Sequence, residues 1–180
     1  PCYYIITSAE ASSNLGRYDG IRYGYADNAA QDLNAYYEGS RDKFGLEVKK
    51  RLIIGTYALT SKNYEECFLK AMKVRELIRQ DFKKVFTQVD LLLTPTSPTT
   101  AFKLGEHDEN PLSLYLADLY TCQGNIGGLA GISVPFGKDK QGLPVGVQFY
   151  GPILQEAKIL NAAYNLEKGL RSFPNFRAAV

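Results

Sequence analysis

GISVPFGKDKQGLPVGVQFY, residues 131–150, joins two apolar runs through a polar segment that is bounded by glycine. Short runs rich in Val, Ile and aromatic residues, closed by glycine and polar residues, are typical of β-strands. The pattern therefore predicts strands over 131–136 and 144–150, with a turn over 137–142. Upstream, VDLLLT at 89–94 is short, apolar and followed by Pro95, which predicts a third, buried strand.

Helical patterns surround these strands. The longest covers 64–86, where apolar residues recur every three or four positions, and Asn63 with Glu66 predicts a capping box at its start. Strands mixed with helices, without an internal repeat, predict an α/β fold in which helices cover a mixed sheet. The other expected helices span residues 4–15, 28–38, 46–59, 112–121 and 155–170.

Composition excludes several classes of protein. The chain has 180 residues, 45% of them hydrophobic, and a net charge of only +2, which argues against a direct nucleic-acid ligand. No run approaches the ~18 consecutive apolar residues of a membrane span. Cys2, Cys67 and Cys122 are odd in number and widely spaced, which favours reduced thiols in a reducing compartment. The first residue is Pro1 and the only methionine is Met72, so we expect a piece of a longer protein.

Motifs taken from the residues alone do not name a reaction. The single histidine, His107, lies in a polar, largely acidic run and is expected at the surface, and no Gly-x-Ser-x-Gly elbow is present. Three scattered cysteines and one histidine do not form a zinc site, so no metal is expected. The glycines at 124, 127, 128 and 131 lack the spacing of a phosphate loop and predict a tight backbone path into the next strand.

Several longer motifs carry a resemblance. In chain order they are SAEASSNLGRYDGIRYG at 8–24, EVKKRLIIGTYAL at 47–59, TPTSPTTAF at 94–102, GISVP at 131–135 and GLPVGVQ at 142–148. The chain resembles the amidase-signature family over residues 1–170, and within it the glutaminase subunits of tRNA-dependent amidotransferases. The resemblance implies that 1–170 is the C-terminal portion of an amidase-signature domain and that 171–180 is a tail.

The family's catalytic machinery consists of a serine nucleophile, a second serine in a cis peptide and a lysine base. No segment of this chain matches the region that carries those residues. The resemblance therefore implies that no catalytic residue lies in the chain and that the Ser-Ser-Lys residues are expected upstream of Pro1.

The resemblance does assign substrate-binding positions. It places Arg51 on the α-carboxylate of glutamine, and Tyr3 and Asp118 on the α-ammonium group. A guanidinium can bind a carboxylate through two parallel hydrogen bonds, and a phenol oxygen and a carboxylate can accept from an ammonium. From the residues alone, other roles stay open. Arg51 could belong to a solvated basic cluster with Lys49 and Lys50, Tyr3 could be a core residue, and Asp118 could pair locally.

The implied function is release of ammonia from glutamine for the ATP-dependent conversion of Glu-tRNA(Gln) to Gln-tRNA(Gln). ATP and magnesium would be used by a partner subunit, tRNA would be bound through the complex, and no cofactor would be bound by this chain. The cytoplasm, or an organellar matrix, is the expected location. Two alternatives remain at this point, a free-standing amidase-signature hydrolase of other amides and a non-catalytic assembly module.

Overall fold

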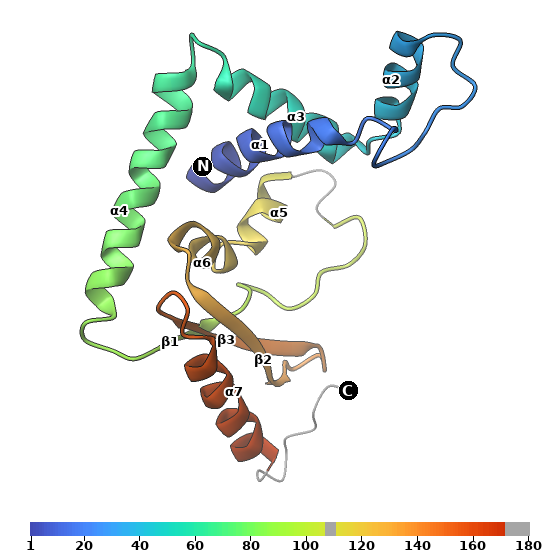
Figure 1. The fold of residues 1–180 in the computed structure, drawn as a ribbon. Helices are drawn as coiled ribbons and strands as arrows, with labels where there is room; N and C mark the ends of the chain where they lie inside the picture. The colour runs from blue at the N-terminus through green and yellow to red at the C-terminus, as the bar shows by residue number, and fades with distance from the viewer. Residues whose placement is uncertain (107–110, 172–180) are drawn as a thin grey trace. The chain divides into compact units, whose positions relative to one another are not determined.

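The computed structural model describes residues 1–106 and 111–171 (Figure 1). The chain divides into two compact units, residues 1–74 and residues 75–180, which are described separately. His107 and residues 172–180 of the expected tail lie outside the described residues.

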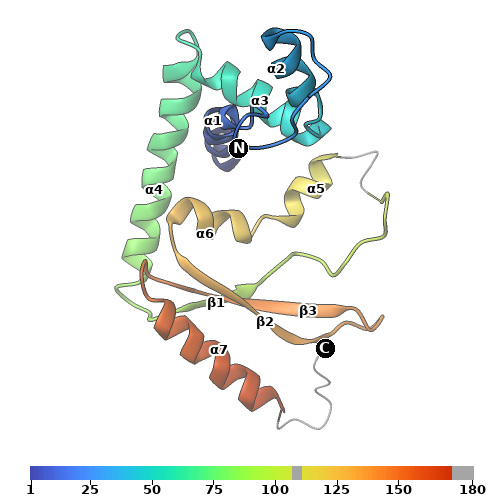
Figure 2. The same cartoon turned by 45° about the vertical axis from the view of Figure 1, so that its right-hand side comes forward.

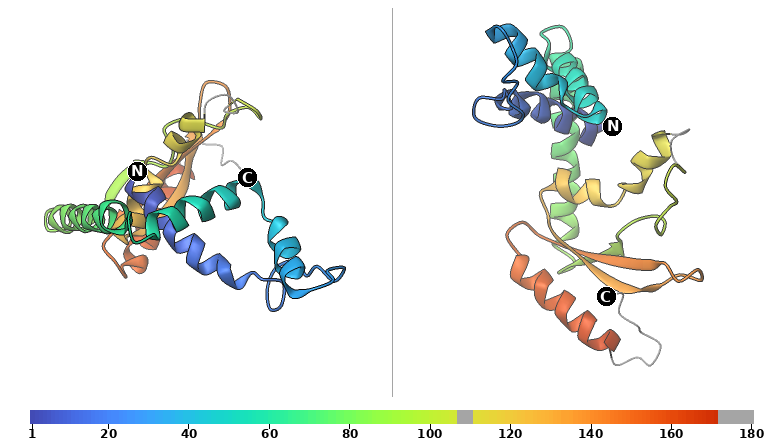
Figure 3. Two further views of the ribbon diagram at one scale, coloured as in Figure 1. Left: turned by 90° about the horizontal axis from the view of Figure 1, so that it is seen from above. Right: turned by 90° about the vertical axis from the view of Figure 1, so that its right-hand side faces the viewer.

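The first unit is helical. Helix α1 (Cys2–Asn14) continues into a 3-10 turn (Leu15–Arg17), and α3 (Leu46–Leu59) packs along α1. Figure 3 shows α1 and α3 side by side, with α2 (Leu33–Asp42) following a long loop. A π-helical turn, η2 (Tyr64–Leu69), leads into α4 (Lys70–Val85), which crosses the boundary between the units.

Close approach of α1 and α3 depends on a glycine. A Cβ at Gly55 would overlap the backbone carbonyl of Ser8 and come within 2.8 Å of the Ser12 hydroxyl. The overlap with Ser8 involves backbone atoms, and these cannot rotate away as a side chain can. Gly55 therefore sets the separation of the two helices, and Ala9 and Ala58 are buried in the same unit.

The second unit is built on a three-stranded sheet in the order β1-β3-β2. Strand β1 (Leu92–Pro95) pairs antiparallel with β3 (Pro144–Gly151), with Leu92 opposite Tyr150. Strand β2 (Ala130–Lys138) forms an antiparallel hairpin with β3 and is bulged between Pro135 and Gly137. Helices α5 (Pro111–Ala117) and α6 (Thr121–Gly127) precede β2, and α7 (Glu156–Arg171) packs on β2 and β3 (Figure 2).

The predicted α/β class, helices covering a sheet, is confirmed. The helix expected over 46–59 has those bounds, and the one expected over 155–170 is α7, displaced by one residue. We expected a mixed sheet, which contains both parallel and antiparallel pairs. In the described residues both strand pairs are antiparallel. The short β2–β3 connection explains this for the hairpin, because a parallel pair needs a long crossover.

Four local expectations were wrong. Helix α2 begins at Leu33 instead of 28, because the Asp32 carboxylate caps it by accepting from the Ala35 amide at 2.9 Å. Asn63 makes no side-chain cap, because its amide group instead donates to the Tyr57 carbonyl and the Thr60 hydroxyl. The helix expected over 112–121 is two helices with a turn between them, α5 and α6.

The fourth wrong expectation is the buried strand over 89–94. The strand that forms there is β1, and its residues alternate between half-buried and exposed. It lies at an edge of the sheet, where a proline such as Pro95 is tolerated because no second ladder needs its missing N–H.

Within the described ranges, none of the helices has the combination of length and apolarity that a bilayer crossing requires.

Candidate functional site

Arg51 lies on α3, and its guanidinium is bound to a neighbouring carboxylate through Nε alone. Its Nε donates to Oε1 of Glu47, one helical turn earlier, at 3.1 Å. The Arg51 side chain is 35% exposed and the Glu47 side chain 54% exposed. No other hydrogen bond from this guanidinium reaches a described residue, so the two terminal NH2 groups are available for a ligand carboxylate.

The basic run 49–51 does not behave as one solvated cluster. Lys49 Nζ pairs with the Asp42 carboxylate at 2.7 Å, and this hydrogen bond lowers the pKa of Asp42. Lys50 is exposed and has no ion pair among the described residues. Helical rotation thus separates three consecutive cations into different surroundings. Of the three, only Arg51 has a carboxylate at its Nε and terminal NH2 groups without a partner among the described residues.

Tyr3 lies at the start of α1 and is half-buried. Its ring packs edge-on against Tyr4, with centroids 5.2 Å apart, and its backbone carbonyl accepts from the Thr7 hydroxyl at 2.9 Å. The Tyr3 hydroxyl has no hydrogen-bond partner within the part of the chain described, so it is available to accept from an ammonium. Tyr3 and Arg51 both belong to the first unit, on helices that pack together.

Asp118 belongs to the second unit, in the turn between α5 and α6. Its backbone carbonyl accepts from the Cys122 amide at 3.0 Å and from the Thr121 hydroxyl at 3.2 Å. Its side chain is exposed, and burial together with this carboxylate raises the pKa of the Cys122 thiol. The assignments of Tyr3, Arg51 and Asp118 to glutamine therefore stay predictions, each with a side chain accessible to a ligand.

The turn that carries Asp118 is anchored to the sheet. Tyr150, which is only 7% exposed, donates from its hydroxyl to the Tyr120 carbonyl at 2.8 Å. A Cβ at Gly124 would overlap the Tyr150 ring, so α6 can lie on that ring only with glycine at 124. Gly128, with φ +68°, then ends the helix in the left-handed conformation that glycine tolerates. The predicted tight glycine path into the next strand is confirmed.

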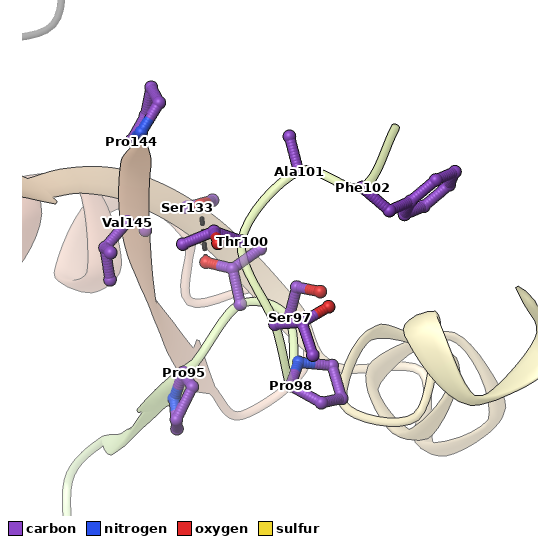
Figure 4. A pocket seen from close by; sticks show the side chains of 12 residues that line it. Pro95, Ser97, Pro98, Thr100, Ala101, Phe102, Ser133, Pro144 and Val145 are labelled. Atoms are coloured by element: carbon purple, nitrogen blue, oxygen red, sulfur yellow. Dashed lines mark hydrogen bonds between the residues drawn. The ribbon is translucent and has the colours of Figure 1, made fainter. Parts of the chain in front are cut away.

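A pocket of about 610 Å³ lies in the second unit, where β1 ends and the β2–β3 hairpin begins its turn. Figure 4 shows the loop at 97–102 facing Ser133, Pro144 and Val145 across it. The volume falls in the range of about 300–1,000 Å³ that is common for small-molecule sites. The lining is made of prolines, hydroxyl residues and small apolar residues, and it contains no charged side chain. Its members are Pro95, Thr96, Ser97, Pro98, Thr99, Thr100, Ala101, Phe102, Ser133, Pro144, Val145 and Gly146.

Hydrogen bonds fix the pocket walls. The hydroxyls of Thr96 and Ser133 lie 2.7 Å apart, and the Thr96 amide donates to the Gly146 carbonyl at 3.1 Å. The Thr100 hydroxyl donates to Oδ2 of Asp139 at 2.9 Å, which ties the loop to the hairpin turn. A charged ligand would find no counter-charge in the lining of this pocket.

Sequence reasoning missed two parts of this arrangement. Glu47 was not identified as the partner of Arg51, although a Glu–Arg pair four residues apart on a helix is a readable signal. The pocket was also missed. Its signal was the run of hydroxyl residues and prolines in TPTSPTT at 94–100, directly after a strand.

The described residues form an α/β domain with an uncharged pocket beside its three-stranded sheet. The chain belongs to the amidase family, whose sequence profile matches residues 1–160. Among curated relatives, the A subunit of glutamyl-tRNA(Gln) amidotransferase from Acaryochloris marina is 52% identical over 93% of this chain and 35% of its own length. The corresponding protein of Thermoanaerobacter pseudethanolicus is 54% identical over 93% of this chain and 34% of its own length. The chain thus spans about a third of the length of these relatives.

Solved structures agree on the fold. The crystal structure of the A subunit of glutamyl-tRNA(Gln) amidotransferase from Thermotoga maritima matches 92% of this chain and 38% of its own, with a TM-score of 0.57 and 36% identity. A second crystal structure, described as an amidase, matches 93% of this chain and 34% of its own, with a TM-score of 0.66. Its identity is only 23%, so it supports the fold alone.

Proposed function

We propose that this chain is part of the glutaminase subunit of a tRNA-dependent amidotransferase, and that it supplies the side of the site that holds glutamine. In the whole enzyme, a serine attacks the side-chain amide of glutamine, ammonia leaves, and water resolves the acyl-enzyme. The Ser-Ser-Lys residues belong to another part of the enzyme. Ammonia then converts Glu-tRNA(Gln) to Gln-tRNA(Gln).

The observation that carries the proposal is a contrast in sequence identity. Relatives named as the A subunit of this amidotransferase are 49–54% identical over nearly the whole chain. Among the solved structures, the A subunit from Thermotoga maritima is 36% identical, whereas family structures that carry other names are 18–23% identical. Arg51 agrees with an amino-acid substrate, because its terminal donors have no partner among the described residues and match the two oxygens of a carboxylate.

The low net charge of the chain agrees with binding of tRNA by partner subunits. A net charge of +2 supplies little excess positive charge for a phosphate backbone, and we assign ATP and magnesium to partner subunits as well. This chain binds glutamine, with Arg51 on the α-carboxylate and Tyr3 and Asp118 on the α-ammonium group. The assembly works where tRNA is charged, in the cytoplasm or an organellar matrix.

The testing experiment measures ammonia release by the whole enzyme, with and without its partner subunits, from glutamine and from a panel of uncharged amides. Preference for glutamine, with release rising when the partners are added, is the expected result. Partner-independent turnover of uncharged amides would contradict the proposal. Absence of ammonia release from every substrate, by an enzyme that still assembles with its partners, would favour a non-catalytic assembly module.

A second candidate function is hydrolysis of uncharged amides by a free-standing amidase. The specific observation in its favour is the pocket at the end of β1, which has no charged lining residue. Substituting Ser133 with Val separates the two candidates. It removes the hydroxyl that Thr96 contacts at 2.7 Å, and it changes turnover of uncharged amides only if they occupy this pocket. Glutamine kinetics would then be affected less than amide kinetics.

A further inference from the structure

Gln148 on β3 carries a side-chain amide that is buried inside the second unit. Among the described residues, the buried polar side chains are those of Ser8, Ser40 and Gln148, and only Gln148 belongs to that unit. Its exposed fraction is 4%. An amide that leaves water is tolerated only when its polar atoms find partners, so the hydrogen bonds of Gln148 show which parts of the fold it holds.

The amide group of Gln148 holds the end of β1. Its Nε2 donates to the Thr94 hydroxyl at 3.0 Å and to the Pro95 carbonyl at 3.1 Å. Because a carbonyl can only accept, the NH2 side of the amide faces β1. Thr94 lies opposite Gln148 in the β1–β3 pairing, and Pro95 is the last residue of β1. The side chain thus fixes β1 where the strand leaves the sheet.

Gln148 also lies beside Tyr150, which anchors the turn that carries Asp118. The two residues are separated by one position on β3, so their side chains lie on the same face of the sheet. Helix α6 covers that face, because Gly124 rests on the Tyr150 ring, and Figure 2 shows α7 on the other side of the sheet. Burial raises the pKa of the Tyr150 phenol, and hydrogen bonds with the Gly124 backbone and the Gln148 side chain oppose that rise. The Gln148 amide therefore contacts the phenol as well as β1.

The phenol passes this restraint to the turn between α5 and α6. The Tyr150 hydroxyl donates to the Tyr120 carbonyl at 2.8 Å, and the Thr121 carbonyl lies 3.5 Å from the same hydroxyl. Both carbonyls follow Asp118 closely in the chain, and the Asp118 carbonyl accepts from the Thr121 hydroxyl at 3.2 Å. One connected set of hydrogen bonds therefore runs from the end of β1 through Gln148 and Tyr150 to the backbone of this turn.

We propose that Gln148 is a positioning residue for the glutamine site. Its amide fixes the Tyr150 phenol, and through that phenol it fixes the turn whose Asp118 carboxylate meets the α-ammonium group of glutamine. The inference rests on the proposed function, which gives Asp118 its ligand. Because Gln148 acts through other residues on a group that binds glutamine, its loss weakens binding and leaves the chemical step nearly unchanged.

The test measures ammonia release from glutamine by the whole enzyme carrying Gln148→Met, which keeps the length of the side chain and removes its N–H donors. We expect the KM for glutamine to rise about three- to tenfold while kcat stays within about twofold of wild type. If Gln148→Met does not fold, Gln148→Asn, which keeps an amide but shortens the side chain, replaces it with the same expected change in KM.

Thr94→Val is the matched control. It removes the hydroxyl that accepts from Gln148 at β1 and leaves the contact between Gln148 and Tyr150 in place. We expect its Tm to fall, as the Tm of Gln148→Met does, but its KM to match wild type. A second comparison places Gln148→Met in an Asp118→Asn background, where we expect no further rise in KM because the positioned carboxylate is gone.

Three results would overturn the inference. A lowered Tm with an unchanged KM in Gln148→Met would show that Gln148 only stabilises the fold. An equal rise of KM in Thr94→Val and Gln148→Met would place the effect at the end of β1. A full effect of Gln148→Met in the Asp118→Asn background would show that it does not act through Asp118. A wild-type enzyme that releases no ammonia from glutamine would instead overturn the proposed function, so the two failures are distinguishable.

Discussion

Arg51 and Glu47 form an ion pair across one turn of α3, with Nε and Oε1 3.1 Å apart. The geometry uses one edge of the guanidinium and leaves its outer donors free. An exposed pair of this kind adds little stability, about 0.2–1 kcal/mol. It restricts the rotation of a long side chain, however, and a guanidinium that is already oriented binds a carboxylate with a smaller loss of entropy. If Arg51 binds glutamine as proposed, we expect Glu47 to act as a positioning residue for it.

Substituting Arg51 with Ala should raise the KM for glutamine. A charge-assisted hydrogen bond contributes about 1.5–3 kcal/mol, so we expect a change of about 10- to 100-fold, with a smaller effect on kcat. Steady-state ammonia release by the whole enzyme gives both constants. The neighbouring Lys50→Ala substitution removes an exposed cation from the same helix and serves as the control. Equal kinetics for wild type and Arg51→Ala would remove Arg51 from the site.

Substitutions of Glu47 test its positioning role through the KM for glutamine. In Glu47→Ala, the KM for glutamine should rise about two- to fivefold while kcat stays constant, because only the orientation of Arg51 is lost. Glu47→Gln keeps an acceptor oxygen and should restore most of the affinity. A purely structural role would instead lower the Tm of both variants alike and leave KM unchanged, and a thermal melt of each variant checks this.

Periodicity made the helices predictable. The helices α4 and α7 follow apolar spacing that is readable without knowledge of the rest of the chain. Boundaries failed where a side chain had two possible partners. Asn63 fits a capping box by its spacing to Glu66, but it donates to Tyr57 in the last turn of α3 and to Thr60, the C-cap of that helix. Sequence spacing does not reveal which of two competing hydrogen bonds forms.

The sequence marked only one wall of the pocket, the run TPTSPTT at 94–100, because the facing wall is distant in sequence. The hydroxyls of Thr96 and Ser133 meet across 37 positions, which requires the β1-β3-β2 strand order. That order follows from pairing between strands, and no local pattern encodes it. Arg51 was assigned through family motifs, whereas its ion pair with Glu47 could have been predicted from helical geometry alone. The part of the candidate site that lies on one helix was thus accessible from sequence, and the part built by the sheet was not.

Substituting Gly55 with Ala should destabilise the first unit. The added methyl group would overlap the Ser8 carbonyl, so α1 and α3 must move apart. Overpacking costs about 1–3 kcal/mol, and at about 2–4 °C per kcal/mol in a chain of this size we expect Tm to fall by about 2–12 °C. Gly16→Ala, where a Cβ meets nothing within 4 Å, is the matched control and should leave Tm nearly unchanged. A Tm for Gly55→Ala equal to that of the control would contradict this packing.

Asp139 should make stability depend on pH in the acidic range. The Leu143 amide, followed by the Thr100 hydroxyl and the Gln141 and Gly142 amides, lowers the pKa of its carboxyl. A lowered folded-state pKa means that the ionised group stabilises the fold above the unfolded-state pKa, and that this contribution is lost as pH falls through the folded-state value. The Tm difference between wild type and Asp139→Asn should therefore be largest near neutrality and shrink below about pH 4.

Thermal melts between about pH 3 and pH 7 measure that difference. Lys140→Ala alters a charge in the same turn without touching the hydrogen bonds of Asp139, and its Tm difference from wild type should not shrink in the same range. A constant offset for Asp139→Asn at every pH would mean that the side chain acts through shape alone, not through its charge.

Tyr150 connects the sheet to the turn that carries Asp118. Burial raises the pKa of the Tyr150 phenol, so its hydroxyl stays protonated and donates to the Tyr120 carbonyl at 2.8 Å. Tyr150→Phe leaves that carbonyl without its partner, which costs about 1–1.5 kcal/mol, and should lower Tm by about 2–5 °C. The exposed Tyr164, substituted with Phe in the same way, is the control and should show no change.

A double-mutant cycle then tests whether Tyr150 acts on glutamine through Asp118. Asp118→Asn should raise the KM for glutamine without lowering Tm, because its side chain is exposed and its backbone hydrogen bonds remain. If Tyr150 positions this carboxylate, Tyr150→Phe raises KM in the wild-type background and has no further effect on KM once Asp118 is Asn. Additive effects on KM would mean that Tyr150 stabilises the fold independently of the ammonium site. An unchanged KM in Asp118→Asn would remove Asp118 from that site altogether.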